Sequence, residues 1–175
     1  DMNIDEIRRV LLLSTTLHEL AHGFNVALCV NDRIDFSNLA EVSANLGQFS
    51  MSEIVKFDLL FVAEMAAMGI AWGYETYSNE AAHTIDLMYA SALKSNKIQG
   101  PPLCVMSNKK KRNNLEFRIE TVTDQLYALL ELSPKDLRSI AAETHNNIFK
   151  SYPVIYQEKL NFHIPMPFDS FELAR

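Results

Sequence analysis

The sequence is poor in cysteine, glycine, proline and histidine, and these shortages exclude several classes of protein. Its 175 residues include 2 Cys, 5 Gly, 6 Pro and 5 His. Cys29 and Cys104 are too few for a disulfide framework, so we expect reduced thiols. The scarcity of glycine and proline argues against a turn-rich β-sandwich and favours helices.

The chain also lacks a basic excess, a signal peptide and an uninterrupted apolar run. It has 16 Lys and Arg against 22 Asp and Glu, a net charge of −6, which argues against a general nucleic-acid binder. The first residues are acidic, whereas a signal peptide begins with basic ones. Polar residues, His18 and Glu19 among them, interrupt the longest apolar stretch, Val10–Val30, so we expect no membrane span. We expect a location in the cytoplasm, or secretion without a conventional signal peptide into another reducing compartment.

Apolar residues recur at helical spacing through most of the chain, which predicts a mostly α-helical single domain over residues 1–175. The expected helices cover residues 5–28, 37–49, 52–72, 78–93, 116–132 and 134–150. The third is apolar on nearly all sides, which predicts a place in the middle of a bundle. The chain starts almost directly in a helical pattern, so we expect a domain of a longer protein.

Two segments do not fit the helical pattern. Residues 95–114 are rich in Lys and Asn and predict a flexible basic loop, with a small hairpin between residues 103–106 and 115–119 as the alternative. Residues 153–175 predict an extended tail, in which residues 160–164 alternate as an edge strand would.

The first predicted helix contains the pattern His18-Glu19-Leu20-Ala21-His22. Two histidines four residues apart project from one helix face, so their rings can bind one metal ion. The glutamate beside the first histidine can reach a water molecule on that metal. This HExxH pattern therefore predicts metal binding, against the alternative of two hydrogen-bonded structural histidines.

A catalytic zinc ion takes three protein ligands and keeps one position for water. Glu41 is the first candidate for the third ligand, because it follows on the next predicted helix, beyond a turn that folds this helix back beside the first. The rival candidates on later helices are Glu64, Glu75, Glu80 and His83.

His18, Glu19, His22 and Glu41 together resemble the zincin metallopeptidases, and more narrowly the gluzincin branch, whose third ligand is a Glu on the next helix. The resemblance covers residues 7–47, under a third of the chain. Thermolysin-like gluzincins carry an Asp four residues after that Glu, which hydrogen-bonds the first histidine. This chain has Asn45 there, which supplies an acceptor without the negative charge.

The resemblance implies a Zn²⁺ cofactor and hydrolysis of peptide bonds in a protein or peptide substrate. Glu19 would take the proton of the zinc-bound water and pass it to the leaving amine. A later His or Tyr would stabilise the oxyanion. His83 is the first candidate for that catalytic role, followed by Tyr74, Tyr77, His145 and Tyr156.

The predicted function is therefore a zinc-dependent endopeptidase. A largely helical zincin core without a preceding sheet suits a bacterial toxin or effector. The alternatives are a regulatory metallopeptidase that cleaves a repressor, and a non-catalytic helical interaction module with a structural metal site. An intramembrane protease is disfavoured, because such enzymes need several membrane spans.

Overall fold

The computed structural model describes residues 3–29 and 39–150 of the chain. These residues form seven helices and no strand, which confirms the prediction of a mostly α-helical chain. The helices are α1 (Ile4–Cys29), α2 (Ala40–Met51), α3 (Val55–Met68), α4 (Glu75–Lys94), α5 (Lys109–Arg112), α6 (Leu115–Leu130) and α7 (Pro134–Lys150).

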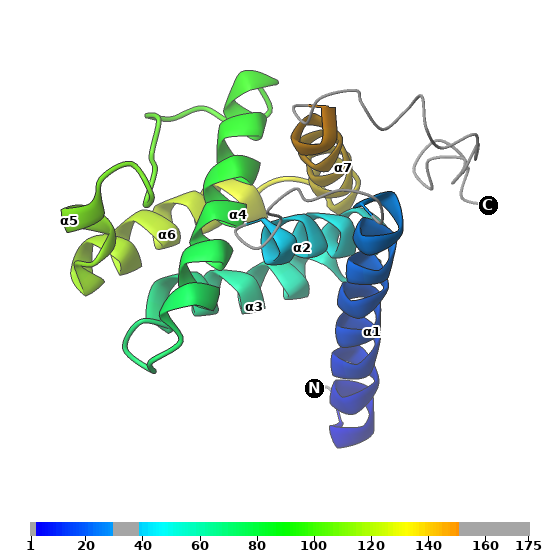
Figure 1. The fold of residues 1–175 in the computed structure, drawn as a ribbon. Helices are drawn as coiled ribbons and strands as arrows, with labels where there is room; N and C mark the ends of the chain where they lie inside the picture. Colours follow the sequence, from blue (N-terminus) through cyan, green and yellow to red (C-terminus); the bar gives the residue numbers. More distant parts are fainter. Residues whose placement is uncertain (1–2, 30–38, 151–175) are drawn as a thin grey trace.

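Helix α2 is the central helix of the bundle (Figure 1). Every residue from Val42 to Phe49 is buried, because α1, α3, α4 and α7 all pack against this helix. Val42, Leu46 and Phe49 recur at helical spacing and belong to the main hydrophobic core. Burial of each such side chain stabilises the fold by about 1.5–3 kcal/mol, so the position of α2 is well determined.

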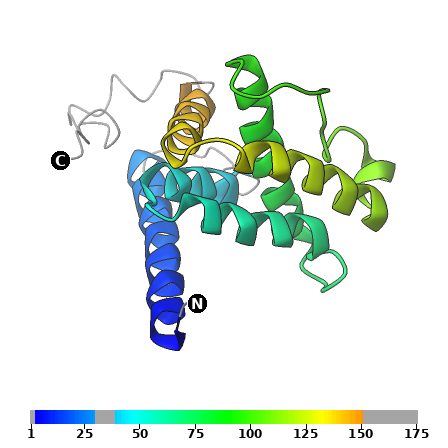
Figure 2. The ribbon, with the colours of Figure 1, turned by 180° about the vertical axis from the view of Figure 1, so that it is seen from behind.

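Helix α1 stands at one side of the bundle, packs mainly against α2, and projects its amino-terminal end past the other helices (Figures 1 and 2). Apolar residues near that end remain exposed, such as Ile4 and Leu12. The buried residues Ser14 and Ala21 lie seven residues apart, and therefore on the same face of the helix. The second half of α1, which carries the two histidines, is thus the half that packs against the bundle.

Local start signals place two helices as the sequence predicts. At α7, Ser133 Oγ accepts a hydrogen bond from the backbone N–H of Asp136, and Pro134 occupies the first helical position. At α1, Asn3 Oδ1 accepts from the N–H groups of Asp5 and Glu6. These caps satisfy amide groups that have no partner within the helix.

Helix α4 begins at Glu75, three residues before the predicted start at residue 78. Ser78 is buried inside the first turn, where its Oγ and backbone C=O accept hydrogen bonds from the Arg118 guanidinium. The same guanidinium donates to the C=O of Ala66 near the end of α3. Arg118 of α6 therefore links the end of α3 to the start of α4 through hydrogen bonds, and this tertiary interaction takes the place of a local cap.

The third predicted helix packs against four others, as its expected place in the middle of the bundle requires, but one of its faces remains exposed. Phe57, Leu60 and Phe61 of α3 are exposed by 37%, 46% and 54%. α2, α4, α6 and α7 pack against the rest of α3, and no described element covers these three side chains. The helix also ends at Met68, before the predicted end at residue 72.

The basic segment forms a loop with one short helix, α5, and the hairpin alternative is excluded because Leu115–Leu130 is helical. The loop is anchored by Asp86 of α4, whose carboxylate accepts from the backbone N–H groups of Val105 and Met106. The alternating residues 160–164 and the predicted extended tail lie outside the described residues.

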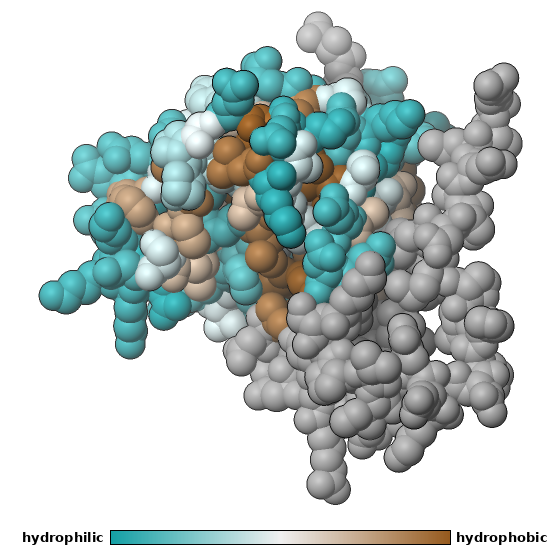
Figure 3. Space-filling view, turned by 90° about the horizontal axis from the view of Figure 1, so that it is seen from above, coloured by the Kyte–Doolittle hydropathy of each residue, from teal (hydrophilic) through white to brown (hydrophobic). Residues whose placement is uncertain are grey.

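None of the described helices has the length and apolarity needed to cross a bilayer. Seen from above in Figure 3, hydrophobic residues gather near the middle of the described surface, with hydrophilic residues around them. This distribution is typical of a helical bundle whose core lies between its helices.

Candidate metal centre

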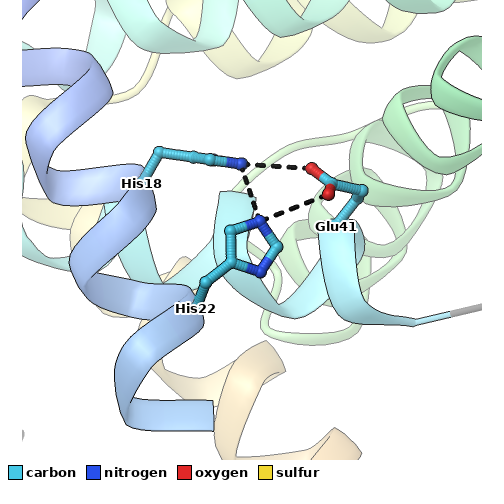
Figure 4. Close-up of side chains that lie close together, drawn as sticks. All are labelled: His18, His22 and Glu41. Atoms are coloured by element: carbon cyan, nitrogen blue, oxygen red, sulfur yellow. Dashed lines mark hydrogen bonds and ion pairs between the residues drawn. The ribbon is translucent and has the colours of Figure 1, made fainter. Parts of the chain in front are cut away.

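Three predicted ligands lie together where α1 meets α2 (Figure 4). His18 Nε2 is 3.1 Å from Glu41 Oε2, and His22 Nε2 is 3.2 Å from Glu41 Oε1. The two Nε2 atoms are 3.1 Å apart. Among the described residues, these three are the group of His, Cys, Asp and Glu side chains whose ligand atoms lie close enough to hold one ion.

The spacing of these donor atoms suits zinc, with the two histidines facing different oxygens of the Glu41 carboxylate. Donors arranged tetrahedrally at zinc bond lengths of about 2.0–2.2 Å lie about 3.3–3.6 Å from one another. The three distances of 3.1–3.2 Å are close to these values. Two imidazoles and one carboxylate are also the ligand types of a catalytic zinc site with a further position left for water.

The hydrogen bonds around His18 identify which ring nitrogen is available to a metal. His18 Nδ1 lies 3.2 Å from Gln48 Oε1, and Gln48 Nε2 donates to Ser14 Oγ over 2.8 Å. Because Gln48 presents its carbonyl oxygen, His18 Nδ1 must carry a proton to donate. In neutral His18 the Nε2 lone pair therefore points toward Glu41 and His22, as metal binding requires.

Protons alone do not satisfy all three contacts while Glu41 is ionised. If both Nε2 atoms carry protons, the two imidazoles face each other as donors. If His18 Nε2 carries none, its lone pair faces a carboxylate oxygen. A metal cation removes the conflict when both Nε2 atoms are unprotonated, because the two lone pairs and the carboxylate oxygen then all face the cation.

The residue that hydrogen-bonds His18 is Gln48, whereas the resemblance suggested Asn45 for this role. Gln48 follows Glu41 by seven residues, about two helical turns, and so lies on nearly the same face of α2. Asn45 is rotated farther round the helix, and its amide donates to Thr84 Oγ1 of α4 over 3.3 Å. The seven-residue spacing places Gln48 on the same face of α2 as Glu41, but its contact with His18 depends on how α2 crosses α1.

A cleft of about 260 Å³ opens beside the triad. His18 and Glu41 form part of its wall, and the apolar part comes from α3 and α4: Phe61, Val62, Met65, Tyr77 and Ala81. Tyr77, one of the oxyanion candidates, is therefore brought to the same cleft as two of the predicted ligands. Two of the three predicted ligands are therefore accessible from this cleft.

Glu19, the predicted proton acceptor, is exposed to solvent. It follows His18 on α1 and is rotated by about 100° around the helix axis from it. Glu19 is not among the described residues that line the cleft. The structure thus places it next to a ligand while its side chain faces outward.

A second carboxylate, Glu80, stands near the triad on α4. Glu80 is 9% exposed, and burial, together with the charge of Glu41, raises its pKa above the usual range. The hydrogen bond between Asn45 and Thr84 lies one helical turn farther along both helices, which explains why Glu41 and Glu80 approach each other. Two carboxyl groups, those of Glu41 and Glu80, therefore lie near each other at the triad.

The remaining candidates lie elsewhere. His83 is not brought to the cleft, because α4 turns Tyr77 and Ala81 toward it and His83 follows Ala81 by about 200° of rotation. Burial lowers the pKa of His83, and Asp86 partly opposes this. Glu64 lines a separate groove on the other side of α3.

His145, Glu75 and Tyr74 are also separate from the triad. His145 is 3% exposed, and burial lowers its pKa to about 4. Glu75 acts on Arg118 through its charge, and Tyr74 is exposed just before α4. Tyr156 lies outside the described residues.

The chain matches no protein-family model, no curated protein and no solved structure among those with which it was compared.

Proposed function

We propose that the protein is a zinc-dependent endopeptidase whose metal ion is held by His18, His22 and Glu41. The observation that carries this proposal is that the Nε2 atoms of His18 and His22 lie 3.1 Å apart and that each lies 3.1–3.2 Å from one oxygen of the Glu41 carboxylate, beside an open cleft. An HExxH pattern on a helix is a specific signal for metal-dependent hydrolysis.

Zinc bound there would lower the pKa of a coordinated water toward about 7 and polarise a substrate carbonyl. Gln48 holds the His18 ring by accepting from its Nδ1–H. Glu19 is assigned as the proton acceptor from its place in the motif, and would then protonate the leaving amine. The Tyr77 hydroxyl lines the cleft and is the best placed of the predicted oxyanion donors.

Metal analysis of the purified protein tests the ligand set. We expect about one zinc ion per chain, lost when His18, His22 or Glu41 is replaced by Ala. Glu64→Ala is the matched control, because Glu64 lies on the other side of α3, and it should keep the metal. A wild-type protein that holds no zinc and takes up none when zinc is added would overturn the proposal.

Catalysis is tested by comparing the wild type with Glu19→Gln. Both should bind zinc, but only the wild type should cleave a peptide library prepared from a digested proteome. New amino termini that appear with both proteins would come from a contaminating protease.

The exposed position of Glu19 favours one alternative, a helical interaction module with a structural metal site. In that case zinc would stabilise the contact between α1 and α2, and neither protein would cleave peptides. Retention of zinc without any cleavage therefore decides for the module.

A further inference from the structure

Phe61 separates two hollows on the surface of the protein. On one side it lines the cleft beside the triad, and on the other it lines a groove of about 440 Å³ between α3 and α6. These two helices pack side by side on the face seen in Figure 2. The two hollows therefore adjoin each other across α3, with Phe61 as their shared wall.

The lining of the groove is mostly apolar and includes one charged residue. Phe57 and Leu60 of α3 and Val122 and Leu126 of α6 contribute large apolar side chains to its lining, and Glu64 contributes the carboxylate. Phe57, Leu60 and Phe61 are exposed by 37%, 46% and 54%, so three large apolar side chains remain in contact with solvent at this groove. Exposed apolar surface that is collected in a groove marks a binding site.

This arrangement favours one occupant of the groove between α3 and α6, namely the same polypeptide that enters the cleft. An extended chain that leaves the cleft over Phe61 reaches the groove without turning back. A helix is about 10 Å across and an extended chain advances about 3.3 Å per residue, so the crossing takes about three residues. A basic side chain beside the apolar one would face Glu64.

We infer that the groove between α3 and α6 is a second binding site for the polypeptide substrate, which takes a large apolar side chain about three or more residues from the bond that is cut. A neighbouring Lys or Arg pairs with Glu64. This inference rests on the proposed function, and it narrows the substrate class to chain segments that carry an apolar anchor at a distance from the cleavage point.

The decisive variant is Leu60→Glu, which puts a carboxylate into the apolar groove on a side chain that is already exposed. The matched control is Tyr127→Glu, because Tyr127 is 68% exposed on α6 and is not part of the groove lining. Zinc content and thermal unfolding should confirm that both variants are folded and hold the metal.

Two measurements are made on each protein. The first is cleavage of the digested-proteome peptide library, read as residue frequencies around each cut. The second is selection of a synthetic random-peptide library on zinc-loaded Glu19→Gln protein, which reports binding without cleavage. We expect apolar enrichment about three or more residues from the cut, with a basic residue beside it, and the same pattern in the selected peptides.

Leu60→Glu should remove this enrichment and weaken binding of a selected peptide by roughly tenfold or more, whereas Tyr127→Glu should change neither. Cleavage with the same residue frequencies in Leu60→Glu would overturn the inference and leave the peptidase intact. Selection that depends on Leu60 without any cleavage would overturn the peptidase and retain the groove as a peptide-binding site. If neither measurement gives a signal, both proposals are wrong.

Discussion

Ala21 of α1 and Gly47 of α2 lie in direct contact where the two helices cross. A Cβ atom at position 47 would be 2.9 Å from the Cβ atom of Ala21, a distance that real side chains do not adopt. Ala21 precedes the ligand His22, and Gly47 precedes Gln48, which contacts His18. The absence of a side chain at position 47 therefore sets the helix separation at which the ligands from α1 reach Glu41.

We expect Gly47→Ala to push α1 away from α2 and to weaken zinc binding together with stability. The atom in the way is fixed to the α1 backbone, so a rotamer change cannot relieve the clash. Overpacking lowers the free energy of unfolding by about 1–3 kcal/mol. The higher helix propensity of Ala offsets up to about 1 kcal/mol of this loss. Denaturant unfolding and zinc titration measure the two effects.

The chain offers a control and a rescue for this substitution. A Cβ at Gly23 of α1 would meet nothing within 4 Å, so Gly23→Ala should leave zinc affinity unchanged. Adding Ala21→Gly to Gly47→Ala removes the blocking atom and should restore affinity. Equal affinity of the wild type and the single variant Gly47→Ala would show that the crossing does not set the metal centre.

Replacement of Gln48 should weaken metal binding through His18. Gln48→Ala removes the acceptor of the Nδ1–H, and loss of such a partner lowers metal affinity by roughly 10–100-fold. Gln48→Glu keeps an acceptor and should retain the affinity. Zinc affinity is measured by competition with a chelator of known strength.

Asn45→Ala is the matched control for Gln48→Ala, since both residues are buried on α2. It breaks the hydrogen bond to Thr84 and should cost about 1 kcal/mol of stability with little change in zinc affinity. If Asn45→Ala lowers the zinc affinity more than Gln48→Ala does, Asn45 and not Gln48 supports His18 as a ligand.

The parts of the fold that follow from short-range signals were predictable from the sequence. Ser133 and Pro134 start α7 because a cap and a fixed backbone angle act within one turn. The exposure of Phe61 was not predictable, because an apolar side chain carries no signal of which neighbours cover it. The start of α4 was also missed, because Ser78 bonds to Arg118, 40 residues away along the chain.

The same distinction applies to the metal centre. His18 and His22 share a helix face by spacing alone, so their proximity was predictable. Glu41 joins them only if α2 crosses α1 at one angle, which depends on Gly47 and Ala21. Gln48 was missed for that reason, because its contact with His18 is set by this crossing and not by local sequence.

Glu80 should act on the metal centre through its charge. Burial and the neighbouring Glu41 raise its pKa, so its ionised form is disfavoured in the folded protein. A raised carboxyl pKa contributes stability at low pH that is lost as the pH rises through the folded value. We therefore expect Glu80→Gln to stabilise the metal-free protein at pH 7, with the gain disappearing under acidic conditions.

In the presence of zinc the same variant should lose several-fold in metal affinity, because one negative charge near the cation has been removed. Glu53→Gln, an exposed glutamate between α2 and α3, serves as the control and should change neither quantity. If Glu80→Gln lowers the stability of the metal-free protein at neutral pH, Glu80 does not carry an unfavourable charge there.

His145 should make the fold sensitive to acid. Burial lowers its pKa to about 4, whereas in the unfolded chain a histidine titrates near 6.5. Between these values the unfolded state binds more protons than the folded state, so stability falls as the pH falls, by at most roughly 1.4 kcal/mol per pH unit. His145→Gln should reduce this dependence between about pH 6.5 and 4. Urea unfolding of both proteins over this pH range gives the slope of the free energy of unfolding against pH for each. A chelator is present so that both proteins are free of metal, and any contribution of His18 and His22 is then the same in both. Parallel slopes across this range would mean that His145 is not the buried neutral histidine that the structure describes.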